Sequence, residues 1–219
     1  MHRRPWWAWP AAATTLGLQF VPTGPDPGDP VAASWLLVQL SWVVLGWLLL
    51  GQPGRRVDGG LALGAGLLAA TDGLKWLDDG PWAVLQYTCY PLAGVLIGWL
   101  VLRWPRRSLQ TDPQRWFVTG ALIGVPLLRL ADVLCWDPSW TGYRGDAWWP
   151  TVVHVRALSD WVYRVSQGYQ LVLLVGFLVL LGLRVARTSR LERWELTPVL
   201  VAGAGFVVST VLELSLIHI

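Results

Sequence analysis

Three pairs of oppositely charged residues lie inside or at the edge of apolar stretches of this chain. They are Asp72 and Lys75, Arg129 and Asp132, and Asp160 and Arg164. Spacings of three or four residues place both members on one helix face, where they neutralise each other. Because charge in lipid is costly, these faces are expected to point into a helix bundle or toward water. The alternative is that the pairs only satisfy each other near the membrane interface and help helices pack.

Two tyrosines, Tyr87 and Tyr90, are expected at a depth similar to that of the charge pairs. Together these eight residues predict a polar ligand-binding or sensing cavity that opens to the outer side. The aromatic linker at 136–150 either covers this cavity as a lid or lies in the headgroup layer. His154 has no second ligand at metal-binding spacing, and no phosphate loop, nucleophile elbow or zinc motif occurs. We therefore expect no catalytic residue, no metal and no cofactor.

Apolar blocks of about twenty residues must position these side chains. Hydrophobic residues make up 54% of the chain and charged residues 14%, against about 25% charged in soluble domains. This pattern predicts an all-α fold, a polytopic bundle of about seven transmembrane helices. The expected spans are 5–21, 31–50, 59–77, 82–104, 116–136, 159–185 and one that begins at 197. Glycine and alanine in the third span favour close helix–helix contact.

Arginine-bearing linkers alternate with acidic linkers between the spans, and positive residues near span ends stay in the cytoplasm. The alternation predicts a cytoplasmic N-terminus, a multi-pass protein of the plasma membrane, and the lipid bilayer as a partner. The cytoplasmic topology determinants are expected to be Arg55, Arg56, Arg103, Arg106, Arg107, Arg184, Arg187, Arg190 and Arg193. Tryptophans such as Trp116 at inner ends, and Trp82 and Trp161 at outer ends, predict aromatic belts at both interfaces. The net charge of +3 does not indicate nucleic-acid binding.

Two stretches of the chain carry a family resemblance. Tyr90-Pro91-Leu92 opens a helix that ends in Val101-Leu102-Arg103-Trp104-Pro105, and Arg193-Trp-Glu-Leu-Thr-Pro-Val-Leu200 precedes the last predicted span. These stretches resemble the membrane-sensor region of actinobacterial sensor histidine kinases. The chain departs from that family at Arg106-Arg107-Ser108, where the family often has Ser-Gly-Arg. It also retains only Cys135 of an element that often contains two cysteines.

The resemblance implies the sensory input domain of a two-component signal-transduction histidine kinase. It further implies a homodimer formed through the parent kinase and a response regulator reached through its kinase core. No phosphoacceptor histidine motif or ATP-binding motif is present in this chain, so enzyme activity would belong to the parent protein. We expect a sensor domain at 1–213. Residues 214–219 are expected to be a non-native tail, similar to translated sequencing adapter, or an ordinary helix end. The alternative function is a small polytopic transporter or a stand-alone membrane protein.

Overall fold

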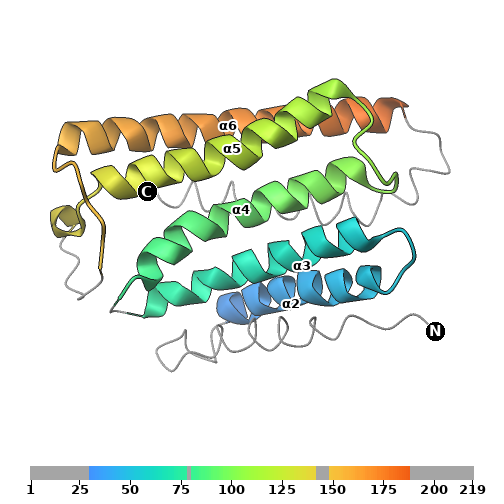
Figure 1. Cartoon of the computed structure of the whole chain (residues 1–219), viewed down its shortest axis with the longest axis horizontal. Helices are drawn as coiled ribbons and strands as arrows, with labels where there is room; N and C mark the ends of the chain where they lie inside the picture. The colour runs from blue at the N-terminus through green and yellow to red at the C-terminus, as the bar shows by residue number, and fades with distance from the viewer. Residues whose placement is uncertain (1–29, 78–79, 142–147, 188–219) are drawn as a thin grey trace.

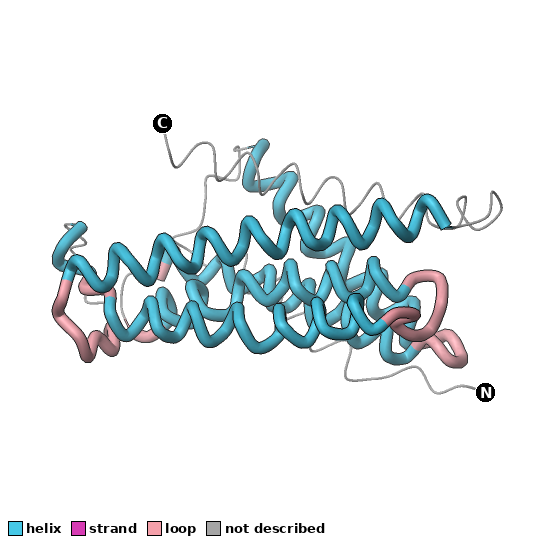
Figure 2. Tube along the Cα trace, turned by 90° about the horizontal axis from the view of Figure 1, so that it is seen from above, coloured by secondary structure: helices cyan, strands magenta, loops and turns pink. Residues whose placement is uncertain are grey.

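The computed structural model describes residues 30–77, 80–141 and 148–187, and this part of the chain is all-helical. Figure 2 shows that loops only connect the helices. The elements in chain order are α2 (Pro30–Leu50), α3 (Arg56–Ala70), the 3-10 helix η1 (Thr71–Trp76), α4 (Trp82–Arg103), α5 (Asp112–Cys135), the 3-10 helix η2 (Pro138–Thr141) and α6 (Arg156–Arg187). The long helices lie side by side in chain order, from α2 at one side of the bundle to α6 at the other, and successive helices run in opposite directions (Figure 1).

The second to sixth predicted spans each have a helical counterpart. Three helices, α4, α5 and α6, are long and apolar enough to cross a membrane. The predicted span at 59–77 is divided, because α3 ends at Ala70 and the chain continues as η1. The more stretched 3-10 geometry gives these two elements a combined length of about 34 Å. The predicted spans at 5–21 and from 197 lie outside the described residues.

Glycines bring α2 and α3 into backbone contact, as the composition of the third span predicts. A Cβ atom on Gly59 would lie 2.6 Å from the backbone nitrogen of Leu50, and one on Gly46 would lie 2.6 Å from that of Leu63. Neither position therefore has room for a side chain. Gly60, in contrast, has no neighbouring atom within 4 Å of such a Cβ, so packing does not explain every glycine of this helix.

We predict that Gly59→Ala destabilises the bundle by about 1–3 kcal/mol, since the new methyl group forces two backbones apart. Gly60→Ala is the matched control in the same helix. It should be neutral or stabilising by up to about 1 kcal/mol, since alanine is the better helix former. Unfolding of both variants in detergent micelles measures the difference. Equal stabilities would contradict the close α2–α3 packing.

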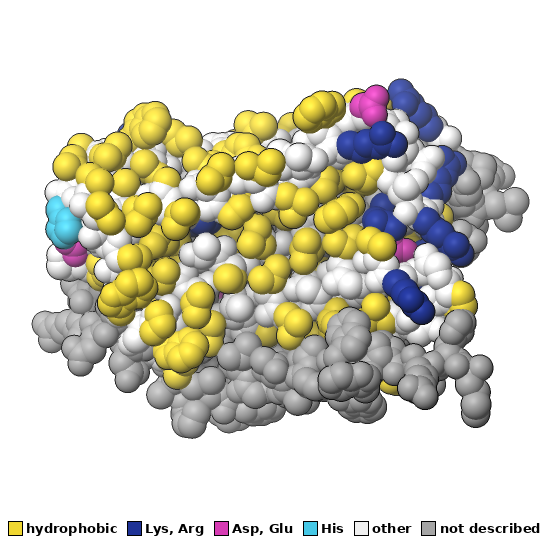
Figure 3. Space-filling model, in the orientation of Figure 1, with side chains coloured by type: hydrophobic (Ala, Val, Ile, Leu, Met, Phe, Trp, Pro, Cys, Tyr) yellow, Lys and Arg dark blue, Asp and Glu magenta, His cyan; other side chains and the backbone are white. Residues whose placement is uncertain are grey.

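Most of the basic side chains visible in Figure 3 gather at one end of the bundle. We call one end the arginine end. It comprises residues 51–58, 103–116 and 184–187, and its described part contains eight arginines and two aspartates. The other end, the linker end, comprises residues 77–82, 136–141 and 148–155. Exposed tryptophans lie near both ends, with Trp116 at the arginine end and Trp82 and Trp161 at the linker end, as expected for two aromatic belts.

A buried ion pair joins α3 to α4 at the arginine end. The Asp58 carboxylate is 1% exposed and lies 2.7 Å from the Nε of Arg103, with Arg55 at 3.7 Å. The Arg55 guanidinium also lies over the Trp104 ring, 4.0 Å from its centroid. These contacts hold the first turn of α3 against the last turn of α4.

Asp58→Ala should destabilise the protein by about 3–5 kcal/mol, because it leaves the buried Arg103 without its carboxylate. The control is Asp112→Ala, at the same end of the molecule. Its carboxylate is 79% exposed and pairs with the exposed Arg115 at 3.3 Å, so its loss should cost less than about 1 kcal/mol. Thermal unfolding in detergent compares the two. Similar losses would mean that the Asp58–Arg103 pair is not structural.

Candidate functional site

A hydrogen bond between two of the helices that are long and apolar enough to cross a membrane forms the centre of the candidate site. The Tyr87 hydroxyl on α4 donates to Oδ2 of Asp132 on α5. The Asp132 side chain is buried, at 2% exposure. On the same face of α5, one turn earlier, the Arg129 guanidinium lies over the Tyr87 ring at 4.7 Å from its centroid. Tyr87 therefore contacts both members of a predicted charge pair.

The contacts of Arg129 and Asp132 differ from the direct neutralisation that their spacing predicts. Within the described chain, no ion pair joins these two residues. Each instead contacts Tyr87 from the neighbouring helix, Asp132 through its hydroxyl and Arg129 through its ring face. The Nε of Arg129 is buried and has no hydrogen-bond partner among the described residues. The pair thus depends on the packing of α4 against α5.

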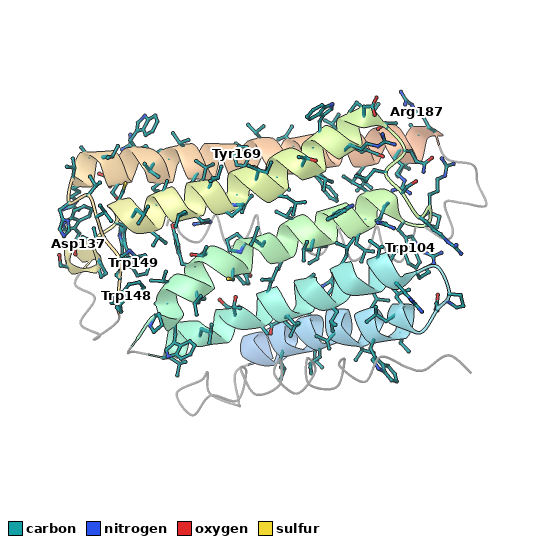
Figure 4. The ribbon with its side chains drawn as sticks, in the orientation of Figure 1. Trp104, Asp137, Trp148, Trp149, Tyr169 and Arg187 are labelled. Carbon is teal, nitrogen blue, oxygen red and sulfur yellow. The ribbon has the colours of Figure 1, made fainter. Side chains whose placement is uncertain are left out.

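The linker after α5 folds back over this group. The Trp149 indole lies edge-on to the rings of Tyr87 and Trp136, with centroids 5.9 Å and 4.5 Å away. Its Nε1–H donates to the Val133 carbonyl at 2.8 Å. Trp148, the preceding residue, is exposed, and Figure 4 shows both tryptophans at the linker end. The linker therefore covers Tyr87 with one tryptophan and presents the other at the surface.

The same linker satisfies the C-terminus of α5, whose last carbonyls have no donor within the helix. The backbone N–H groups of Val152 and Val153 donate to the Leu134 carbonyl at 2.9 and 3.1 Å. The Thr151 hydroxyl donates to the Trp136 carbonyl at 2.6 Å. These hydrogen bonds fix the linker backbone against the helix end, and they place Trp149 at Tyr87.

The other predicted site residues lie in different surroundings. Asp72, in η1, accepts a hydrogen bond from Nε2 of Gln86 at 3.3 Å. Gln86 directly precedes Tyr87 on α4. Tyr90 is half-buried on α4, and the Lys75 side chain lies outside the described residues. Asp160 and Arg164 are both exposed on α6, and no described contact brings them to Tyr87. The structure thus brings Tyr87, Arg129 and Asp132 together and separates them from the α6 pair.

Sequence reasoning did not single out Trp149 as a residue of this site. Its signal was the Trp148-Trp149-Pro150 run in a linker whose two possible positions were left open. We call Tyr87, Arg129, Asp132, Trp136 and Trp149 the polar cluster. The whole chain matches no family model, no curated protein and no solved structure.

Tyr87→Phe should destabilise the bundle by about 1–3 kcal/mol, because it leaves the buried Asp132 carboxylate without its hydroxyl donor. Tyr163→Phe is the control, since that side chain is exposed on α6 and its loss should change stability by less than about 0.5 kcal/mol. Thermal unfolding in the same detergent compares the two. If both variants unfold at the same temperature as the parent protein, the hydroxyl does not stabilise the α4–α5 contact.

Proposed function

We propose that this chain is a membrane-embedded sensory input domain of a two-component histidine kinase. In this proposal it lies in the plasma membrane as a multi-pass bundle of about seven spans with a cytoplasmic N-terminus. It acts as a homodimer formed through the parent kinase, and the kinase core passes the signal to a response regulator. The observation that carries the proposal is the Tyr87–Asp132 hydrogen bond, which joins two membrane helices directly below Trp149.

The membrane setting supports a functional role for this bond. An ionisable residue inside a membrane bundle is costly, and it marks a functional site by default. Asp132 is buried among apolar helices, and its donor comes from the neighbouring helix rather than from its own. A stimulus that breaks this bond would therefore change how α4 packs against α5.

The composition of α4 makes Tyr87 a suitable point for such a change. Pro91 lies inside α4, and proline has no N–H to donate to the carbonyl one turn earlier, which belongs to Tyr87. The helix is thus weakened at the residue that contacts Asp132. Packed helices with two arrangements respond to small displacements. A ligand or a bilayer change shifts the balance only if it binds the two arrangements with different affinity.

A path from the polar cluster to the opposite end runs through α4. Its last carbonyls, at Val101, Leu102 and Trp104, accept hydrogen bonds from the Arg184 guanidinium of α6. Movement of α4 would therefore act on the end of α6. In the proposed orientation this end lies on the cytoplasmic side of the membrane. A kinase core would receive the signal on that side.

Asp132→Asn should shift the response of the full-length parent kinase to its stimulus by about fivefold or more, while membrane insertion remains normal. The reason is that the amide keeps the shape of the side chain and removes the charge that the Tyr87 hydroxyl contacts. Reporter expression controlled by the response regulator measures the shift. Asp160→Asn removes the same charge from the exposed face of α6 and should leave the response unchanged. Unaltered signalling by Asp132→Asn at normal abundance would contradict the sensor role.

Sequencing of the locus beyond the codon for Glu213 tests the kinase assignment itself. A reading frame that continues through one more span into a phosphoacceptor histidine and an ATP-binding domain would support it, because seven spans from a cytoplasmic N-terminus would leave the kinase core on the outer side. A stop codon directly after Ile219 would favour a transporter or a stand-alone membrane protein instead.

A further inference from the structure

We propose that the arginine end binds the headgroups of anionic phospholipids. The described part of this end carries eight arginines against two aspartates, a surplus of six positive charges. Positive-inside topology accounts for the sign of the surplus. It does not say which arginines remain available to lipid, and the structure shows some of them occupied inside the protein and others facing outward.

The first group is occupied inside the protein. Arg103 and Arg55 face the buried Asp58 carboxylate at 2.7 and 3.7 Å. Arg184 donates to the carbonyls at the end of α4, including that of Val101 at 2.9 Å. These side chains hold the helices together, so they are not free to turn toward lipid.

The second group faces outward. Arg56 begins α3, Arg107 lies in the loop after α4, and Arg187 ends α6, and all three are exposed. No described carboxylate forms an ion pair with any of these three. Of the two aspartates at this end, Asp58 is buried, and Asp112 already pairs with Arg115 at 3.3 Å. These three arginines therefore present positive charge that no described acidic side chain balances.

Contacts between the loops place these outward arginines on one continuous surface. The Arg107 guanidinium lies against Gly54, so tightly that a Cβ atom there would overlap it. This contact joins the α2–α3 loop to the α4–α5 loop. Arg184, one turn before Arg187, is bonded to the Trp104 carbonyl beside the same loop. Figure 3 shows the basic side chains gathered at this end, and Figure 4 labels Trp104 and Arg187 there.

The depth of this surface fits a lipid headgroup rather than a soluble partner. Trp116, beside Arg115 in the first turns of α5, is 76% exposed, and exposed tryptophans of membrane helices lie at the headgroup level. Guanidinium groups at that level meet lipid phosphates, which they bind with paired hydrogen bonds. The uncompensated arginines attract a headgroup with net negative charge. They attract a zwitterionic headgroup less, because its own positive group repels them.

The test is native mass spectrometry of the detergent-solubilised full chain titrated with phosphatidylglycerol or phosphatidylcholine. We expect the parent protein to retain phosphatidylglycerol in preference. The double variant Arg56→Gln/Arg187→Gln should weaken this preference by about tenfold. Neither side chain has a described contact, so the bundle should remain folded. Raising the salt from about 0.1 M to about 1 M should also reduce the preference, since the screening length falls from about 10 Å to about 3 Å.

The control is Arg156→Gln/Arg164→Gln, which removes two exposed arginines from α6 toward the linker end. It should retain phosphatidylglycerol as the parent does. Equal retention of both lipids by the parent would overturn the proposal. So would an equal loss in the test and control variants, because the effect would then follow net charge rather than this surface. This outcome does not depend on whether the chain is a sensor, since no signalling is measured.

Discussion

Two buried carboxylates, Asp58 and Asp132, impose the constraint on which this bundle depends. Burying a carboxylate is costly unless hydrogen bonds or an opposite charge compensate for the lost water. Both carboxylates find their main partner on α4, Asp58 in Arg103 and Asp132 in Tyr87. As a result α4 is fixed to α3 at the arginine end and to α5 at the linker end. The helix at the centre of the bundle is thus held by polar contacts at its two ends, with apolar packing between them.

The attachment of α6 follows a different principle. Its polar contacts reach backbone carbonyls rather than buried carboxylates. Tyr169 donates to the Gly120 carbonyl of α5 at 2.7 Å, and Arg184 donates to the end of α4. Gly124 leaves the space that the Tyr169 ring occupies, because a Cβ atom there would overlap its hydroxyl. With few buried residues along its length, α6 is held to the other described helices at only a few points.

The sequence predicted the described helices well, because each is an apolar block bounded by polar linkers. The start of a helix was harder to place, as α5 illustrates. The predicted span begins at Trp116, whereas the helix begins at Asp112, where the Gln114 side chain accepts from the backbone N–H groups of Gln110 and Thr111. This polar first turn precedes the apolar block. Hydropathy therefore marks where the chain becomes apolar, and capping marks where the helix starts.

The candidate site was only partly predictable, because its contacts are not local. The three-residue spacing of Arg129 and Asp132 correctly places them on one face, but their common partner is separated by 45 residues from Asp132. Asp58 was missed for a similar reason. Beside Arg55 and Arg56 it looks like part of a charged linker, and only the packing of α3 against α4 shows that it is buried. Asp160 and Arg164 have the spacing of a helix pair, yet they lie exposed on α6.

The two ends of α4 also bear on each other. Tyr87 and Arg103 lie on one continuous helix, about 24 Å apart along its axis, and Pro91 interrupts the hydrogen bonding between them. A displacement at Tyr87 can be absorbed by bending at the proline or carried along the helix to Arg103 and Arg184. A lipid or another ligand that stabilises the arginine end would hold the C-terminal end of α4 more firmly. That end would then move less when Tyr87 is displaced. In the proposed sensor, a ligand that binds at Trp149 and a ligand that binds at the arginine end would change each other's affinity by the same factor, because coupling between two binding sites is reciprocal.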